Sequence, residues 1–184
     1  LYKGKGVIIV ESKEAAIEAL NHLYASEPKQ TILFEDYLVG QEQSLICFVS
    51  NHRIIPLGTA RDSQKRFEND QGPNTGGVGA YSPAQTLAAH HNQQVNEILN
   101  KIEEGLVHEG LMYNGILFIG FMIDETDVHV LEFNARFGDP ETQVLLSRLE
   151  SDLYKIIDIN LAGDLQTHDI VMADNKSLIT VLMS

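Results

Sequence analysis

The chain has 184 residues, 43% of them hydrophobic, and a formal net charge of −13. This length allows one domain, or one domain with a small appended lobe, and the apolar content can supply a substantial core. The excess of acids argues against a nucleic-acid partner, the single cysteine excludes an internal disulfide, and no apolar run approaches the roughly 18 residues of a membrane span. We therefore expect an α/β domain in the cytoplasm, with neither nucleic acid nor membrane as a partner.

A glycine-rich turn at residues 3–6 precedes an apolar segment, residues 7–10, that is typical of a strand. Lys5 on this turn can contact a phosphate through its charge, although the spacing is not that of a P-loop. The alternative is a basic turn in solvent. Ser12 comes before apolar residues at helical spacing, which predicts a helix over residues 12–25, and residues 31–35 predict a second short strand.

The segment that follows ends in acids, bends at Gly40 and restarts as a strand at residues 45–50. Glu35 and Glu42 stand at the two ends of the bend. A carboxylate there can accept hydrogen bonds from two sugar hydroxyls, and free backbone groups in the bend can bind the edge of a purine. The alternative is an ordinary solvated connection. Beyond it, residues 45–50 and 53–59 predict a β-hairpin.

Residues 61–83 carry clustered charges and then four glycines in eight residues, without a clear period. Such glycines are costly to order unless the backbone adopts a positive φ or approaches a ligand closely. Loops of this kind offer backbone N–H groups to anions, although a tight structural loop is the commoner explanation. We expect a long loop, and long loops inside compact domains are often functional.

A predicted helix over residues 84–109 comes next, followed by a β-hairpin of residues 114–123 and 128–134. His90 and His91 lie near the start of this helix. Adjacent residues do not share one helical face, so we expect both histidines in solvent. The single cysteine, Cys47, lies in an apolar strand and is expected in the core.

The second strand of this hairpin ends in two oxygen donors, Glu132 and Asn134. Because successive strand residues point to opposite faces, these two share one side with Val128 and Val130. They lie roughly 6.6 Å apart along the backbone, so their side chains can converge on one hard cation. Magnesium takes such ligands together with water and phosphate oxygens. The alternative is a strand end that meets solvent.

Arg136 lies on a short connection between this strand and a predicted helix over residues 140–161. Asp139 is expected at the N-cap of that helix, Glu141 adds favourable charge in its first turn, and Gly163 is expected to end it. A guanidinium on the connection can bind a carboxylate or phosphate through two hydrogen bonds. The alternative is a surface ion pair between Arg136 and Asp139.

Four segments, in this order, resemble the phosphoribosylamine–glycine ligases, the glycinamide ribonucleotide synthetases of purine biosynthesis. They read GKGV at 4–7, FEDYLVGQE at 34–42, DQGPNTGGVGAYSP at 70–83 and LEFNARFGDPETQ at 131–143. The last two are highly specific to this family, whereas the first two are shared more widely among ATP-grasp enzymes. The resemblance implies an ATP-grasp fold of the α/β (α+β) class. Residues 37–184 would form the main antiparallel-sheet lobe with helices, and residues 1–36 a remnant of the small nucleotide-binding lobe.

The resemblance also implies a reaction, in which ATP phosphorylates glycine and the amine of 5-phosphoribosylamine then displaces the phosphate. Mg²⁺ or Mn²⁺ would accompany ATP, with Glu132 and Asn134 as ligands and Arg136 binding the acyl phosphate or a substrate oxyanion. The residues implied to bind ATP are Lys5, Glu35, Asp36, Leu38 and Glu42. Those implied to hold 5-phosphoribosylamine and glycine are Asp70, Gly72, Asn74, Thr75, Gly76 and Gly77.

The chain departs from the family pattern in two respects. Residues 62–66 read DSQKR where the family commonly has DHKR, which leaves the contacts of the substrate loop open. The chain also lacks the family's N-terminal and C-terminal domains, so we expect a fragment that is inactive alone and has those domains of the same protein as partners. The strand before the metal motif has no acid until Asp124, as in this family. Another ATP-grasp carboxylate–amine ligase and a non-catalytic nucleotide-binding module are the alternatives.

Overall fold

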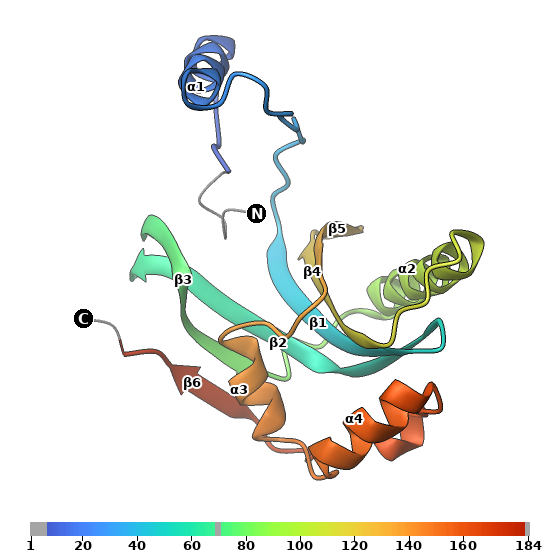
Figure 1. Cartoon of the computed structure of the whole chain (residues 1–184). Helices are drawn as coiled ribbons and strands as arrows, with labels where there is room; N and C mark the ends of the chain where they lie inside the picture. Colours follow the sequence, from blue (N-terminus) through green and yellow to red (C-terminus); the bar gives the residue numbers. More distant parts are fainter. Residues whose placement is uncertain (1–6, 69–70, 183–184) are drawn as a thin grey trace. The chain divides into compact units, whose positions relative to one another are not determined.

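The computed structural model describes residues 7–68 and 71–182. They belong to two compact units, Leu1–Leu38 and Val39–Ser184, which we describe separately. Figure 1 labels the elements along the chain. The helices are α1 (Lys13–Ser26), α2 (Ala89–His108), α3 (Glu141–Leu146) and α4 (Leu153–Ala162), with a short 3-10 turn at Thr167–Asp169. The strands are β1 (Gln41–Ser50), β2 (Arg53–Phe67), β3 (Gln71–Ser82), β4 (Gly115–Ile123), β5 (Val128–Asn134) and β6 (Ser177–Thr180).

The described part of the first unit contains one helix, α1. Its N-cap is Ser12, whose hydroxyl accepts a hydrogen bond from the backbone N–H of Ala15 at 3.1 Å, so the predicted helix is confirmed. The helix has no buried residue. Residues 7–10 and 31–35, which we expected as strands, are in neither helix nor strand. Strand geometry needs a hydrogen-bonded neighbour, and neither segment is paired.

The second unit is built on one six-stranded sheet of order β5-β4-β1-β2-β3-β6, in which all neighbours are antiparallel. The hairpin predicted between β1 and β2 is confirmed. Its turn residues, Asn51 and His52, have φ angles of 49° and 67°, and positive φ at both central positions is the geometry of a two-residue hairpin turn. The hairpin of β4 and β5 is confirmed as well.

The expected long loop over residues 61–83 is wrong, because residues 61–67 and 71–82 lie in paired strands. The outer part of β2 pairs with β3, from Arg61 opposite Tyr81 to Phe67 opposite Gln71. The register shifts twice between Ser63 and Phe67. Because of these irregularities and the glycines of β3, the sequence does not alternate between apolar and polar residues here. That alternation is the signal from which strands are predicted, so these strands were missed.

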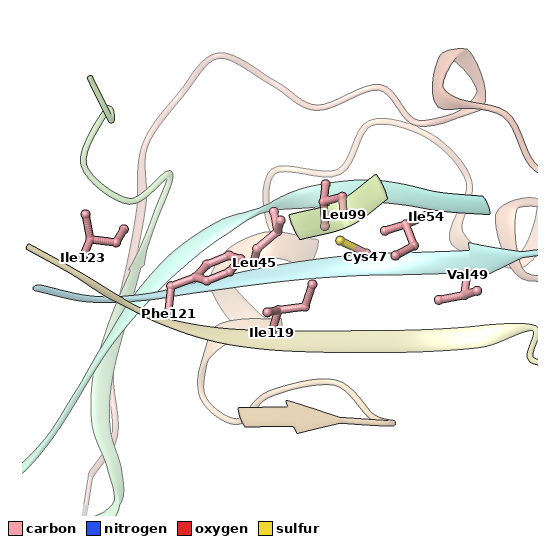
Figure 2. Packing of buried hydrophobic residues seen from close by; sticks show 8 residues of the cluster. All are labelled: Leu45, Cys47, Val49, Ile54, Leu99, Ile119, Phe121 and Ile123. Atoms are coloured by element: carbon pink, nitrogen blue, oxygen red, sulfur yellow. The ribbon is translucent and has the colours of Figure 1, made fainter. Parts of the chain in front are cut away.

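Helices cover both faces of the sheet, and each face has its own apolar core. The face towards α2 carries the residues shown in Figure 2, where Leu99 of the helix lies over Leu45, Cys47 and Ile119. The face towards α3 and α4 carries a second cluster: Ile46, Phe48, Ile55, Leu57, Phe118, Leu145, Ile156 and Leu165. Consecutive residues of β1 therefore belong to different cores. None of the helices in the described residues has the length and composition to cross a membrane.

Helix α2 begins later than predicted, at Ala89, because the chain before it is extended through Ala88. The prediction that both histidines are in solvent is wrong for His91. Only 8% of its surface is exposed, and its Nε2 atom has no hydrogen-bond partner. His90 is exposed, with its Nε2 atom 3.3 Å from the backbone oxygen of Glu125.

The single helix predicted over residues 140–161 is two helices. After α3 the chain turns away, Leu149 forms a β-bridge with Met172, and the N–H of Glu150 donates to the oxygen of Val171 at 2.9 Å. Asp152 then caps α4 by accepting from the N–H of Tyr154 at 2.9 Å. The apolar period runs through the break because both helices and the connection pack against the same core. The helix stop at Gly163 is confirmed, with a φ of 82°.

Candidate functional site

Glu132 and Asn134 lie on the sheet face that α3 and α4 cover, and a bulge in β5 puts them there. Val130 pairs with Phe121, but Glu132 pairs with the adjacent Gly120, so Leu131 is the extra residue. Cross-strand partners point to the same face. The expectation that Val128 and Val130 share a side with Glu132 and Asn134 is therefore wrong, because one inserted residue reverses the alternation.

The two oxygen donors are adjacent. The side-chain nitrogen of Asn134 donates to Oε1 of Glu132 at 2.9 Å. The side chain of Glu132 also lies close to Gly120 of β4, since a Cβ atom at position 120 would be 3.2 Å from its Cγ. A carboxylate and an amide this close, at the exposed end of a strand, fit the oxygen ligands that Mg²⁺ prefers.

The turn after β5 carries Arg136, whose Nη1 atom donates to the backbone oxygen of Phe137 at 2.8 Å. No ion pair forms between Arg136 and Asp139, so that alternative is not what the structure shows. Asp139 is not the N-cap of α3. Its carboxylate instead accepts from the side chain of Gln143 at 2.8 Å. Arg136 is exposed and follows Asn134 by two residues, so its guanidinium is free to bind an anion from solvent.

Glu141, predicted only as favourable charge in a first helical turn, is buried beside β1. It is 4% exposed, and its Oε1 atom accepts from the hydroxyl of Ser44 on β1 at 3.3 Å. Burial raises the pKa of this carboxyl above its ordinary value and the charge of Asp62 raises it further, while Arg136 acts in the opposite direction. The one clue in the sequence was its position directly after the metal motif. Ser44 had none.

The glycine-rich segment and the turn after β5 meet at one contact. Gly77 of β3 has a φ of 108°, and a Cβ atom there would stand 2.5 Å from the ring of Pro140. Thr75 holds this part of the hairpin, since its hydroxyl donates to the backbone oxygen of Gln64 at 2.8 Å and accepts from the N–H of Gly77 at 3.1 Å. The structure thus brings two of the segments singled out in the sequence together.

The other residues of the glycine-rich segment differ from one another. Gly72 has a φ of 86°, and a Cβ atom there would strike the ring of Phe67, so the hairpin itself requires this glycine. Gly76 has nothing within 4 Å of where its Cβ would be. Asn74 pairs with Lys65 across the hairpin.

The expected ATP-binding residues are distributed over both units. Glu42 is exposed on β1 opposite Met122, two residues from Ser44, so it lies on the same sheet face as Glu132. Glu35, Asp36 and Leu38 belong to the first unit and are in neither helix nor strand. Two expected residues fall outside the described part of the chain: Lys5 and Asp70.

Comparison with solved structures identifies the fold. A phosphoribosylamine–glycine ligase from Thermotoga maritima superposes with a TM-score of 0.84 at 28% identity, over 98% of this chain and 46% of that one. A biotin carboxylase from Campylobacter jejuni has a TM-score of 0.66 at 18% identity, over 95% and 38% of the two chains, which indicates a shared fold alone. The expected ATP-grasp fold of an antiparallel sheet with helices is confirmed.

Comparison of sequences gives the family. A phosphoribosylamine–glycine ligase from Halalkalibacterium halodurans is 44% identical over 168 residues, which are 89% of this chain and 39% of that protein. The trifunctional purine biosynthetic protein adenosine-3 of Bos taurus is 41% identical over 189 residues, 100% of this chain and 19% of that protein. The chain thus spans less than half of these relatives. The model of the phosphoribosylglycinamide synthetase ATP-grasp (A) domain matches residues 1–142, and the chain belongs to this family.

Proposed function

We propose that this chain is the ATP-binding part of a phosphoribosylamine–glycine ligase and acts within a longer cytoplasmic polypeptide. The reaction joins glycine to 5-phosphoribosylamine at the expense of ATP and gives glycinamide ribonucleotide, ADP and phosphate. The observation that carries the proposal is the pair of Glu132 and Asn134 at the end of β5, where the side-chain nitrogen of Asn134 is 2.9 Å from Oε1 of Glu132. Arg136 follows in the next turn of the chain. Family membership and relatives of that activity support it.

The chemistry has two steps. In the first, a carboxylate oxygen of glycine attacks the γ-phosphorus of ATP, and the bond from that phosphorus to the bridging oxygen of ADP breaks. In the second, the amine nitrogen attacks the carbonyl carbon of glycyl phosphate, phosphate leaves, and the amine proton passes to solvent. Neither step needs a protein nucleophile. The only cysteine agrees with this, because burial raises the pKa of Cys47 to about 12 and leaves no thiolate at neutral pH.

In this proposal each side chain of the site has an electrostatic task. Glu132 and Asn134 hold Mg²⁺ or Mn²⁺, which supplies neutralising charge to the phosphates. Arg136 binds the acyl phosphate, since its donors match a phosphate in two-bond geometry. Groups fixed in advance at the place where charge develops are the main source of catalysis in phosphoryl transfer.

The substrates are assigned to the remaining residues. Residues 1–36 form the small lobe and residues 37–184 the main lobe. The purine is held by Glu35 and the backbone of Asp36 and Leu38, the ribose by Glu42 and the phosphates by Lys5. The residues that hold 5-phosphoribosylamine and glycine are Asp70, Gly72, Asn74, Thr75, Gly76 and Gly77. The contact of Gly77 with Pro140 supports this assignment, because it sets the substrate segment against the turn of Arg136.

The test is turnover by the full-length protein that carries this chain, and by the chain alone. Each is incubated with Mg-ATP, glycine and freshly prepared 5-phosphoribosylamine, and glycinamide ribonucleotide is detected by mass spectrometry. We expect product from the full-length protein only. Glu132→Gln should abolish it, whereas Glu125→Gln, at an exposed acid of the β4–β5 turn, should leave it unchanged.

Other outcomes would overturn the proposal in distinct ways. ADP formation that depends on bicarbonate but not on glycine would identify a different ATP-grasp carboxylate–amine ligase. Nucleotide binding without ADP formation under any of these conditions would identify a non-catalytic module. Product from the chain alone would contradict the expectation that it is inactive by itself.

A further inference from the structure

A cavity of about 300 Å³ lies on the face of the sheet that α2 covers. Its lining comes from the start of β1, the end of β4 and the segment that leads into α2. Gln41 of β1 pairs with Ile123 of β4, and Figure 2 shows Ile123 at the end of the apolar cluster away from Val49. Glu42 and Glu132 lie on the opposite face, so this cavity is separate from the proposed ATP site.

Two buried polar atoms of the lining lack a hydrogen-bond partner among the described residues. They are Nε2 of Gln41 and Nε2 of His91. His91 as a whole is only 8% exposed. Leaving a buried donor unpaired is unfavourable, and such atoms are rare in native proteins unless a ligand or water meets them. A third unpaired atom, Oε1 of Gln43, belongs to a residue that does not line this cavity.

The first turn of α2 adds backbone donors. The helix begins at Ala89, and its N-cap is Ala88, which has no side-chain oxygen to accept from the first N–H groups. Ala88 and His91 both line the cavity, so this end of the helix borders it. The first N–H groups of a helix lack partners within the helix, and the helix dipole concentrates positive charge there. The 20-residue helix therefore favours negative charge at the cavity.

Asp124 is the only acid among the described lining residues, and its carboxylate is directed elsewhere. Oδ1 accepts from the N–H groups of Thr126 and Asp127, both at 2.8 Å, and Oδ2 is 3.1 Å from Nε2 of His129. These contacts hold the pKa of Asp124 well below its ordinary value. His129 follows Val128, which packs in the core under α2, so His129 points to the opposite face. The charge of Asp124 is thus turned away from the cavity.

We propose that this cavity binds a small carboxylate anion through Nε2 of Gln41, Nε2 of His91 and the first N–H groups of α2. All of these groups can donate, and a carboxylate accepts several hydrogen bonds at once. No lysine or arginine is found among the described lining residues, so a single negative charge fits better than the double charge of phosphate. The inference does not rest on the proposed function, because none of these residues belongs to the proposed ATP or substrate sites.

Two variants remove the unpaired donors, and two matched variants serve as controls. His91→Leu and Gln41→Leu replace each donor by an apolar side chain, and removing an unpaired buried polar group need not destabilise the fold. His90→Leu changes the neighbouring histidine, which is exposed. Gln93→Leu changes an exposed glutamine of α2, whose side chain donates to Glu97 at 2.9 Å.

The experiment uses the full-length protein with Mg-ADP and glycine present, so that these ligands occupy their own sites. Fluoroacetate is the probe, and its dissociation constant is measured by fluorine NMR at constant ionic strength. Spectra of the protein labelled with nitrogen-15 in its histidines show which ring responds. We expect a saturable shift of the His91 ring and a smaller one of His90. His91→Leu and Gln41→Leu should weaken binding at least about tenfold, because a hydrogen bond to a charged group is lost.

The controls and a competitor complete the test. His90→Leu and Gln93→Leu should change the dissociation constant less than about twofold, since exposed polar groups contribute little. Acetate should displace fluoroacetate, and phosphate should be at least about tenfold less effective, because the site is matched to a single charge.

Three outcomes would overturn the inference. If the His91 ring shows no saturable response up to roughly 0.1 M probe, about a hundredfold above a millimolar dissociation constant, the cavity holds only water. If His91→Leu and His90→Leu weaken binding equally, or neither does, the probe binds elsewhere. If phosphate competes as well as acetate, the site does not select carboxylates. The wild-type histidine spectra decide the first question even if a variant does not fold.

Discussion

The two faces of the sheet use the same strands for different purposes. On the face towards α2, β1 and β4 contribute Leu45, Ile119 and Phe121, all apolar and at most 6% exposed. On the other face, neighbouring positions of the same strands carry Ser44 and Gly120, which lie in one row with Glu132 of β5. The difference teaches that these strands carry an apolar core on both faces, and that the face towards α3 and α4 also carries polar residues beside its core. Both are possible because successive residues of a strand alternate between the faces.

The bulge at Leu131 changes the sheet face to which the side chains of β5 point. Val128 packs against the core under α2, yet four residues later Glu132 points to the opposite face. Regular pairing would keep both on one side. One inserted residue therefore lets a single strand pack in the core at its start and present oxygen donors at its end.

The largest expected loss of stability comes from removing a buried ring on the face towards α2. Phe121→Ala removes a ring that is 1% exposed, and we expect it to lower the free energy of unfolding by about 3–5 kcal/mol. Urea denaturation followed by circular dichroism measures this. Phe133→Ala, at a ring that is 53% exposed, is the control and should lower it by less than about 1 kcal/mol. Phe133 pairs with Ile119 on the same face, so equal losses would show that burial does not determine the cost of removing a ring there.

A smaller loss is expected from Arg148, which joins the end of α3 to the segment before β6. Arg148 is 8% exposed, and its guanidinium donates to the oxygens of Asn175 and Ala173 and to the hydroxyl of Ser82, at 2.7, 2.9 and 2.9 Å. Arg148→Met leaves these acceptors without their donor and should lower the unfolding free energy by roughly 2–3 kcal/mol.

The control for Arg148 is Arg53→Met. Arg53 is exposed, and its guanidinium donates to the side chain of Gln166 at 2.8 Å. Thermal and urea unfolding should show little change, since exposed polar pairs contribute little. A loss as large as that for Arg148 would show that burial is not what makes the bonds of Arg148 important.

On the polar face, a variant should change binding more than stability. Glu132→Gln removes the charge of a proposed ligand at an exposed strand end. We expect Mn²⁺ affinity, measured by electron paramagnetic resonance, to fall at least about tenfold, or about 1.4 kcal/mol. The melting temperature should stay within about 2 °C, because Glu132 is not part of either core. Unchanged Mn²⁺ binding would exclude Glu132 as a ligand.

The smallest effect is a pH dependence from Glu141. Its pKa is raised in the folded protein, so the folded state keeps a proton that the unfolded state releases near the ordinary glutamate pKa of about 4.3. The stability that this protonation contributes is complete below that pH and is lost as pH rises through the folded pKa.

Glu141→Gln removes this titration. We therefore expect the variant to gain stability relative to the wild type as the pH rises above the ordinary glutamate pKa of about 4.3, as measured by urea unfolding at each pH. Glu150→Gln should show no such trend. A relative loss of stability with rising pH would mean that the folded protein favours the charged form of Glu141.

Motifs and turns were predictable from the sequence because their signals are local. Asn51 and His52 mark a two-residue turn, and Gly163 ends α4 with a positive φ. Glu132 and Asn134 were predicted as metal ligands from their residue types alone, and their role stays a prediction. Their common side was predicted as well, because both follow the bulge.

What could not be predicted depends on pairing between distant segments. The bulge at Leu131 exists only relative to β4, the break after α3 depends on the bridge of Leu149 with Met172, and the burial of His91 depends on the sheet beneath α2. Glu141 belongs to this group. Its sequence position suggests a surface charge, and only the packing of α3 over Ser44 places it inside.

The contact between Gly77 and Pro140 has a consequence for how such sequences can diverge. A side chain at position 77 would overlap the proline ring, so a larger residue there demands a smaller one at 140. Loss of the proline alone would not be sufficient, because the φ of 108° at Gly77 also disfavours every L side chain. Across an alignment of relatives, position 77 should therefore stay glycine even where position 140 changes.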